Sequence, residues 1–137
     1  MKALLQRVSS ASVSVAGECV GEIGAGLLVL LGLDRGDDQP GALRMLERIL
    51  AYRVFADGEG RMNRSVADVS GGVLLVSQFT LSADTRKGLR PGFSGAMPPQ
   101  EARPLYDFLL AELKRRYPQV AAGLFGAAPS YTQFANT

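Results

Sequence analysis

Residues 77–81, Ser-Gln-Phe-Thr-Leu, gather the side chains of this sequence that are best suited to chemistry. They follow the apolar run 73–76, so a strand that ends there would present hydroxyls, an amide and an aromatic ring at a sheet edge. One interpretation is structural, because Ser and Thr at a strand end commonly bond to the neighbouring backbone. The other is an acyl site, in which backbone N–H groups hold an oxyanion and Thr80 or Gln78 orients the substrate. Composition leaves both interpretations open.

The scarcity of catalytic side chains narrows the chemistry. The 137 residues include no His and one Cys, which is Cys19. Without imidazole there is no Ser-His-Asp or Cys-His triad, no histidine base and no histidine-ligated metal. A single cysteine also excludes an internal disulfide and a cysteine-cluster zinc site. An enzyme with this sequence has to work without imidazole.

Length and charge describe an ordinary small domain. The chain is 47% hydrophobic and 20% charged, and its net charge of +2 is too small to indicate a nucleic-acid binder by itself. The longest apolar run, residues 27–31, is far shorter than a membrane span, and the N-terminal residues lack a signal-peptide core. We therefore predict a cytoplasmic protein with one domain over residues 1–137.

The elements that must position residues 77–81 follow from hydrophobic periodicity. Alternating or uniformly apolar segments predict strands, and apolar residues three and four apart predict two helices. Pro40 suits the first turn of one helix, with Asp37 or Asp38 as its cap. The predicted strands are 2–9, 11–16, 19–23, 26–33, 52–55 and 73–76, the last of which runs into residues 77–81. The predicted helices are 40–50 and 99–117, and residues 57–60 form a hairpin turn. The fold class is α/β, a mixed, barrel-like β-sheet core with two main helices. Residues 82–98 are predicted to form a long basic loop, and a loop of that length in a compact domain is usually either functional or disordered.

Two other segments invite a ligand and are explained more simply. The glycines of residues 21–26 have the order G-x-x-G-x-G and lead into a strand, so no helix N-terminus is available to hold a phosphate. We interpret them as turn glycines. Asp34, Asp37 and Asp38 lack the spacing of a calcium loop, which favours helix caps and solvated charges.

Four segments together resemble one family. They are residues 1–8, residues 21–32, the Ser-Gln-Phe-Thr-Leu segment and residues 90–93, Arg-Pro-Gly-Phe. In this order they are similar to D-aminoacyl-tRNA deacylase, and the similarity runs from Met1 to about Gly126. The resemblance implies a homodimeric enzyme that hydrolyses the ester between a D-amino acid, or glycine, and the terminal ribose of tRNA.

The resemblance also implies site residues and partners. The family's Ser-Gln-Phe-Thr motif corresponds to Ser77, Gln78, Phe79 and Thr80, which we predict to be catalytic. Gln6, Arg7, Phe79 and Arg90 are expected to bind the substrate, with Arg7 supporting the cleft. The expected partners are the acceptor end of D-aminoacyl-tRNA and a second copy of the chain. Neither a metal nor another cofactor is expected, and neither DNA nor a membrane is an expected partner.

The missing histidine is consistent with this family. An aminoacyl ester is already activated, so positioning and oxyanion stabilisation can supply much of the rate. The backbone amides near Phe79 and Thr80 would face the ester carbonyl, and the 2′-hydroxyl of the substrate would assist. Thr80 would then position the substrate rather than attack it, because no residue is available to deprotonate its hydroxyl. A tRNA-binding domain of the same fold without catalysis is the alternative, and a hydrolase of other small acyl esters is a weaker one.

Two further expectations concern the surface and the end of the sequence. Arg86, Lys87 and Arg90, with residues 114–116, are candidate phosphate contacts or simply solvated charges. Family members reject L-amino acids with a Gly-Pro pair from the partner subunit, in an Asn-x-Gly-Pro-Val-Thr segment. This sequence ends at residues 136–137, Asn-Thr, where that segment would begin. We expect a chain without it to discriminate D from L poorly and to leave a sheet edge open.

Overall fold

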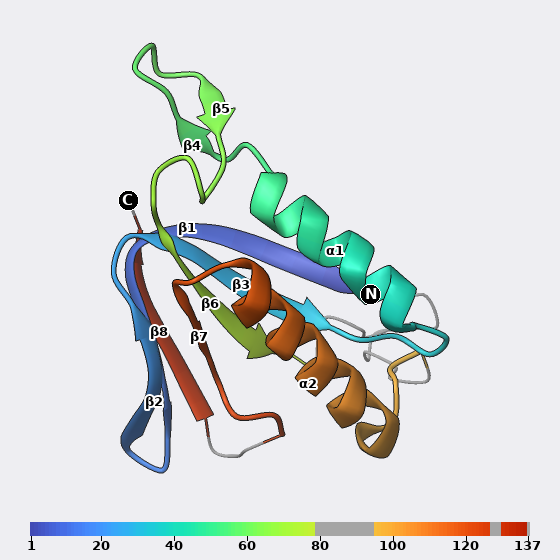
Figure 1. Cartoon of the computed structure of the whole chain (residues 1–137). Helices are drawn as coiled ribbons and strands as arrows, with labels where there is room; N and C mark the ends of the chain where they lie inside the picture. The colour runs from blue at the N-terminus through green and yellow to red at the C-terminus, as the bar shows by residue number, and fades with distance from the viewer. Residues whose placement is uncertain (79–94, 127–129, 137) are drawn as a thin grey trace, which may run out of the picture.

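The sheet and both helices are described by a computed structural model, which covers residues 1–78, 95–126 and 130–136. Helices α1 and α2 lie on one side of a curved sheet of six strands, and a two-stranded hairpin projects from one end (Figure 1). The strands are β1 (Lys2–Val15), β2 (Glu18–Ile23), β3 (Gly26–Gly32), β4 (Phe55–Ala56), β5 (Met62–Arg64), β6 (Gly72–Ser77), β7 (Val120–Ala122) and β8 (Ser130–Asn136), and the helices are α1 (Gln39–Ala51) and α2 (Pro99–Arg116).

Strand β1 is the longest element of the sheet, and it has different partners along its two halves. Its first half pairs antiparallel with β3, from Lys2 opposite Gly32 to Val8 opposite Gly26. Its second half pairs antiparallel with β2 on one side and with β8 on the other. The chain reverses between β1 and β2 at Ala16 and Gly17, whose φ values of 51° and 83° are those of a tight hairpin turn.

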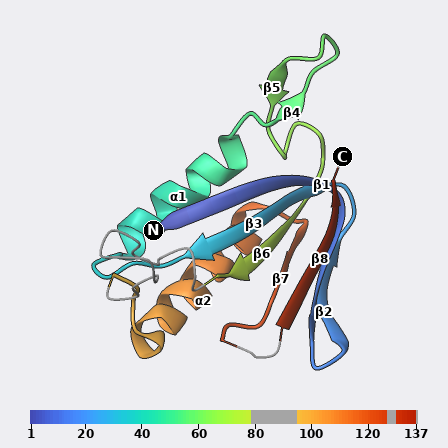
Figure 2. The ribbon, with the colours of Figure 1, turned by 180° about the vertical axis from the view of Figure 1, so that it is seen from behind.

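Strands β3, β6 and β7 run parallel to one another and bring their carboxyl ends to one edge. The strand order β2-β1-β3-β6-β7, with β8 on the free side of β1, curls the sheet until β2 approaches β7. Figure 2 shows this curl from behind, with β2 and β8 beside each other across β1. The result is the barrel-like mixed sheet that the sequence predicts.

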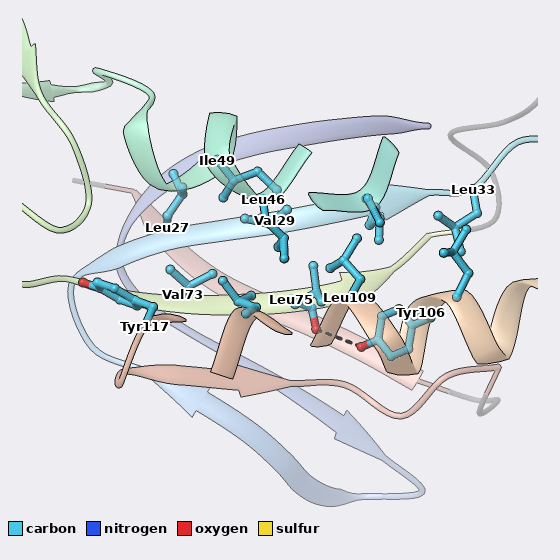
Figure 3. Packing of buried hydrophobic residues seen from close by; sticks show 14 of the residues in the cluster. Leu27, Val29, Leu33, Leu46, Ile49, Val73, Leu75, Tyr106, Leu109 and Tyr117 are labelled. Atoms are coloured by element: carbon cyan, nitrogen blue, oxygen red, sulfur yellow. Dashed lines mark hydrogen bonds between the residues drawn. The ribbon is translucent and has the colours of Figure 1, made fainter. Parts of the chain in front are cut away.

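The main core lies between the sheet and the helices. Leu27 and Val29 of β3, with Val73 and Leu75 of β6, point toward both helices (Figure 3), and Leu31 belongs to the same buried cluster. Helix α1 contributes Leu46 and Ile49, and α2 contributes Leu105, Leu109 and Leu113. The side chain of Asp38 caps α1 by accepting a hydrogen bond from the Gly41 amide at 2.9 Å, as predicted.

A smaller core fills the inside of the curl. The second half of β1 places Val8, Ala11 and Val13 against Leu28, Leu74 and Val76, all buried. The first half of β1 has no such cover on this face, and Leu4, opposite Leu30, is 54% exposed. Phe134 pairs with Ala11 on the same face and is 50% exposed. The face turned away from the helices is therefore only partly covered by this chain.

The structure confirms the α/β fold with two helices in one sheet-based unit, and it corrects several details. Residues 2–15 form one continuous strand rather than two. The predicted strand at residues 52–55 is reduced to Phe55–Ala56, and the strand predicted at residues 73–76 spans Gly72–Ser77. Strands β7 and β8 are not predicted by the pattern, and β8 pairs with the edge of β1 from Val8 to Val15. None of the described helices is long and apolar enough to cross a membrane.

Candidate active site

A cavity of about 480 Å³ opens at the carboxyl ends of β3 and β6. Ser77, the last residue of β6, and Gln78 supply its polar side chains. The walls are apolar, and they include Leu31, Leu33, Val76, Met97, Leu124 and Phe125. No charged residue is among the described residues that line it, so this cavity offers an uncharged, partly apolar space beside a hydroxyl and an amide.

The backbone at Gln78 is already engaged in the sheet. Its amide donates to the carbonyl of Leu31 at 2.7 Å, which extends the β3–β6 pairing by one step. An oxyanion in this cavity therefore cannot use the Gln78 amide without breaking that bond. Backbone donors for such an oxyanion would have to come from elsewhere along the chain.

Tyr106 supports the cavity wall from behind. Its hydroxyl donates to the carbonyl of Gly123 at 3.1 Å and lies 3.4 Å from that of Leu75 (Figure 3). Its ring lies 5.4 Å from that of Phe125, centroid to centroid. Burial raises the pKa of Tyr106 to about 12, so the hydroxyl keeps its proton and remains a donor. This contact fixes α2 against the end of β6 and the segment that follows β7.

Gln6 and Arg7 lie at a different place on the sheet. Ser77 is in register with Leu31, which faces Ala3, whereas Gln6 and Arg7 face Leu28 and Leu27. At about 3.4 Å per residue, they lie roughly 10–14 Å further along β1. Within one chain, the structure therefore does not bring Gln6 and Arg7 to Ser77 and Gln78.

A second groove, of about 550 Å³, surrounds Gln6 and Arg7. The side-chain amide of Gln6 donates to Oδ1 of Asn136 at 2.7 Å, and a guanidinium nitrogen of Arg7 lies 3.2 Å from the sulfur of Met62. Val54 and Met62 belong to the projecting hairpin and its base, so this groove lies between β1 and that hairpin.

Several predicted residues lie outside the described part of the chain. They are Phe79, Thr80 and Arg90 of the predicted site, together with Arg86 and Lys87 of the basic loop. The predictions made for them stay predictions.

The acidic and basic clusters noted in the sequence have local partners. The carboxylates of Asp34 and Asp37 each lie 2.8 Å from the α-amino nitrogen of Met1, and Asp38 caps α1. Within the described ranges no group of three or more acidic or cysteine side chains could hold a metal ion. On α2, Arg115 pairs with Glu112 at 2.7 Å, and Arg116 lies 3.5 Å from Glu112 and 3.9 Å from Glu47. Two of the three basic residues at 114–116 are thus engaged in ion pairs.

The apolar walls of the cavity are what sequence reasoning missed. Met97 precedes α2, while Leu124 and Phe125 follow the short strand β7, and none of them belongs to a polar motif. The sequence gives no signal for them, because single apolar residues beside a strand are ordinary and the 58% exposure of Leu124 is known only from the structure.

Comparisons with known proteins identify relatives of the chain. The family model described as D-Tyr-tRNA(Tyr) deacylase matches residues 4–134. The D-aminoacyl-tRNA deacylases of Azotobacter vinelandii and Stutzerimonas stutzeri are 61% and 59% identical to this chain over 127 residues, which are 93% of this chain and 88% of each relative. That of Nitrosococcus oceani is 57% identical over 93% of this chain and 82% of its own length.

Two solved structures share the fold. The c-Myc DNA Unwinding Element Binding Protein superposes with a TM-score of 0.93 and 40% identity, over 100% of this chain and 93% of that protein. A probable eukaryotic D-amino acid tRNA deacylase superposes with a TM-score of 0.80 over 98% of this chain and 92% of its own, at 16% identity, which supports the fold alone.

Proposed function

The chain belongs to the D-Tyr-tRNA(Tyr) deacylase family, and on this premise we propose how it acts. It is an ester hydrolase that cleaves the bond between a D-amino acid and tRNA, and it also acts on glycine-charged tRNA, releasing the free amino acid. The observation that carries this proposal is the identity of about 60% to D-aminoacyl-tRNA deacylases along nearly the whole chain. The reaction removes wrongly charged tRNA before it is used in translation.

The cavity at Ser77 suits this reaction. An aminoacyl ester carries a small polar head and a nucleoside, and an uncharged, largely apolar cavity next to a hydroxyl and an amide matches both parts. The ester is activated, so orientation and charge stabilisation can lower the barrier without a strong base. The absence of histidine from the sequence is compatible with such a mechanism.

The proposed roles of the site residues depend on which backbone amides are free to donate a hydrogen bond to the oxyanion. The amide of Gln78 is engaged with Leu31, so the proposed oxyanion donors are the backbone amides near Phe79 and Thr80. Ser77 and the Gln78 side chain orient the ester, and Thr80 positions the substrate. The substrate's 2′-hydroxyl assists in delivering water. Arg90 is proposed to bind the substrate from the basic loop.

A homodimer would complete this site. Two observations support the proposal: Leu4 and Phe134 are half-exposed on the sheet face that the helices leave open, and Gln6 and Arg7 lie too far from Ser77 to act with it in one chain. In a two-fold dimer the same patch meets itself, and each copy could bring its Gln6 and Arg7 to the partner's cavity. Light scattering should give a mass about twice 14.6 kDa.

A charge on the open face tests this assembly. Leu4→Lys should yield a monomer with little activity, because burying an unpaired ammonium is costly. Glu18→Lys, which places a lysine at an exposed position of β2, is the control and should remain dimeric. A fully active monomer would refute the shared site.

A substrate panel tests the function itself. D-Tyr-tRNA, L-Tyr-tRNA, glycyl-tRNA and a free D-tyrosine ester are incubated with the protein, and release of the amino acid is measured. Release from D-Tyr-tRNA and glycyl-tRNA, but not from the free ester, is expected, and the ratio of D to L measures the stereochemical selectivity. Binding of tRNA without turnover would favour the alternative, a tRNA-binding domain of this fold.

We propose the cytoplasm as the place of action, since aminoacyl-tRNA is used there. No cofactor is part of the proposed reaction, and neither is DNA or a membrane. One solved relative is named for binding a DNA unwinding element, so a duplex DNA control belongs in every tRNA-binding measurement.

A further inference from the structure

A hairpin of residues 52–64 projects from the body of the molecule, and we call it the arm. It comprises β4, β5 and the turn between them, and it stands clear of the sheet and helices in both views (Figures 1 and 2). Tyr52 is 58% and Met62 53% exposed, although residues of these types are usually well covered. The activity proposed above assigns no role to the arm.

The arm is built to hold its shape. At the tip, Oδ1 of Asp57 accepts hydrogen bonds from the amides of Glu59 (2.8 Å) and Arg61 (3.0 Å), and the Asp57 amide donates to the Arg61 carbonyl at 2.8 Å. At the base, Phe55 is buried in the main core. Just beyond the base, the amide of Ser65 donates to Asp68 at 2.8 Å. A hairpin held at both ends loses little conformational entropy when it binds a partner.

Three arginines of the arm are available to a partner. Arg53, Arg61 and Arg64 form no ion pair with a carboxylate in the described part of the chain, and only Arg53 has a side-chain partner, Asn63 at 3.3 Å. The nearby acids are occupied locally. The backbone amides of Arg61 and Glu59 hold the pKa of Asp57 below its usual range, and hydrogen bonds from Ser65 do the same for the pKa of Asp68. Glu59, at the tip, is the remaining acidic residue of the arm.

The basic end of α2 makes a useful contrast. Arg115 and Arg116 are held by Glu112 and Glu47, so a partner would have to compete for them. In the described part of the chain the guanidinium groups of the arm have no carboxylate within ion-pair distance, and only the longer-range attraction of Asp57 and Asp68 acts on Arg64 and Arg53. The groove at the foot of the arm adds Arg7 to the same region.

We propose that the arm is a contact surface for the sugar–phosphate backbone of the substrate's tRNA. This inference rests on the proposed function. A guanidinium group binds phosphate with two parallel hydrogen bonds, and unpaired arginines on a preorganised hairpin can do so without rearrangement. Tyr52 offers a face on which an unpaired base or a ribose can pack. Binding through phosphates adds affinity for any tRNA, whichever amino acid it carries.

Paired substrates separate this role from catalysis. The double variant Arg61→Gln/Arg64→Gln is compared with Arg44→Gln/Arg103→Gln, which removes two charges from exposed positions on the helices. Each is assayed with D-Tyr-tRNA and with 3′-O-D-tyrosyl-adenosine, which has the ester but no phosphate. For the arm variant, kcat/KM on tRNA should fall about tenfold at physiological salt, and the slope of log affinity against log salt should decrease by about two. Activity on the adenosine ester should not change, and the control should stay close to wild type on both substrates.

A variant that adds positive charge keeps the proposal testable even if the arginine variants misfold. Glu59→Lys at the exposed tip adds positive charge without touching the hydrogen bonds of Asp57 side-chain oxygens, and it should tighten tRNA binding several-fold. Equal losses on tRNA and adenosine ester, or dissociation into monomers by light scattering, would assign the arm to catalysis or assembly and overturn the proposal. If wild type hydrolyses neither substrate, the proposed activity fails. In that case, titration of the same variants with tRNA that carries no amino acid decides whether the arm binds RNA.

Discussion

The parallel strands β3 and β6 are apolar along their length, but their two ends differ in how closely the neighbouring atoms pack. At the carboxyl end the strands give way to a cavity of about 480 Å³. At the amino end Gly26 pairs with Gly72 so closely that a Cβ on Gly26 would lie 2.0 Å from the Gly72 carbonyl oxygen. The hydroxyl of Tyr117 donates to the carbonyls of Gly71 and Val66 beside this contact, and a groove of about 470 Å³ lies outside it.

The difference shows how one pair of strands can serve both stability and chemistry. Glycines remove side chains at the amino end, so backbone packs on backbone and no space remains for a ligand in that contact. Side chains continue to the carboxyl end, where Ser77 and Gln78 present polar groups to open space. Substitutions at the amino end should therefore change folding, and those at the carboxyl end should change the reaction.

The largest effect is expected from Gly26→Ala. The new methyl group would meet backbone atoms that cannot move without breaking the β3–β6 pairing, so the free energy of unfolding should fall by at least about 3 kcal/mol. Urea unfolding monitored by circular dichroism measures the loss. Gly24→Ala is the matched control, because a Cβ there meets nothing within 4 Å, and it should change stability by less than about 0.5 kcal/mol. Similar midpoints for both variants would contradict the close packing of the amino end.

The second prediction concerns chemistry at the carboxyl end. If the substrate's 2′-hydroxyl assists hydrolysis, D-Tyr-tRNA with a terminal 2′-deoxyribose should react about 10²–10³-fold more slowly. Thr80→Ala should keep substantial activity, because the proposed role of Thr80 is to position the substrate and not to attack it. Single-turnover rates at saturating enzyme provide the measurement. A folded, tRNA-binding Thr80→Ala protein without activity would instead make Thr80 the nucleophile.

Two buried tyrosines allow the two ends to be compared directly. Tyr106→Phe removes the hydroxyl donor of the Gly123 carbonyl, and Tyr117→Phe removes that of the Gly71 carbonyl, so each variant should lose about 1–2 kcal/mol of stability. Only Tyr106 supports the cavity wall, through Gly123, so only its variant should also raise KM for D-Tyr-tRNA. The Phe125 ring contact survives in Tyr106→Phe, which isolates the effect of the hydroxyl. A raised KM in Tyr117→Phe would show that the two ends are coupled.

The smallest effect is expected at Ser70, beside the amino end. Ser70 has a φ of 53°, which a residue with a Cβ adopts at a cost. Ser70→Gly should therefore stabilise the protein by about 0.5–1 kcal/mol in thermal or urea unfolding, partly offset by the greater freedom of glycine in the unfolded chain. Activity should be unchanged. Lost activity would mean that the strained turn serves function, which would end the division between the two ends.

Local patterns account for much of the fold. Uniformly apolar residues at 26–33 and 73–76 predict β3 and β6, and the helical spacing of Leu43, Leu46 and Leu50 predicts α1. Asp38 is one of the two caps that the sequence offers for this helix. Strand β7 has three residues, which is too short for a period to emerge. Strand β8 lies at an edge, where Thr132 to Asn136 are exposed, so its sequence lacks the apolar alternation of a covered strand.

The candidate site is harder to predict from the sequence, because its composition depends on the register in which the strands pair. The motif at residues 77–81 predicts a location for the chemistry, and two of its residues, Ser77 and Gln78, line a cavity. The separation of Gln6 and Arg7 from Ser77 depends on which residues face one another across β1, β3 and β6. The sequence does not distinguish the arginines of the arm from those of α2 either. Only the structure shows that Arg115 and Arg116 are paired and that the arginines of the arm form no ion pair with the described residues.

The partner strands on the two sides of β1 are synthesised at different times. Its partners β2 and β3 follow it immediately, so this long hairpin can form while the ribosome is still making the helices. Its partner β8 is the last of the described strands to be synthesised, so Val8 cannot pair with Asn136 until then. Throughout synthesis the second half of β1 therefore offers an unpaired edge to any other nascent strand. Copies of the chain are crowded together on a polysome. The time until β8 is synthesised and the access of chaperones to the open edge of β1 would therefore govern the yield of native protein.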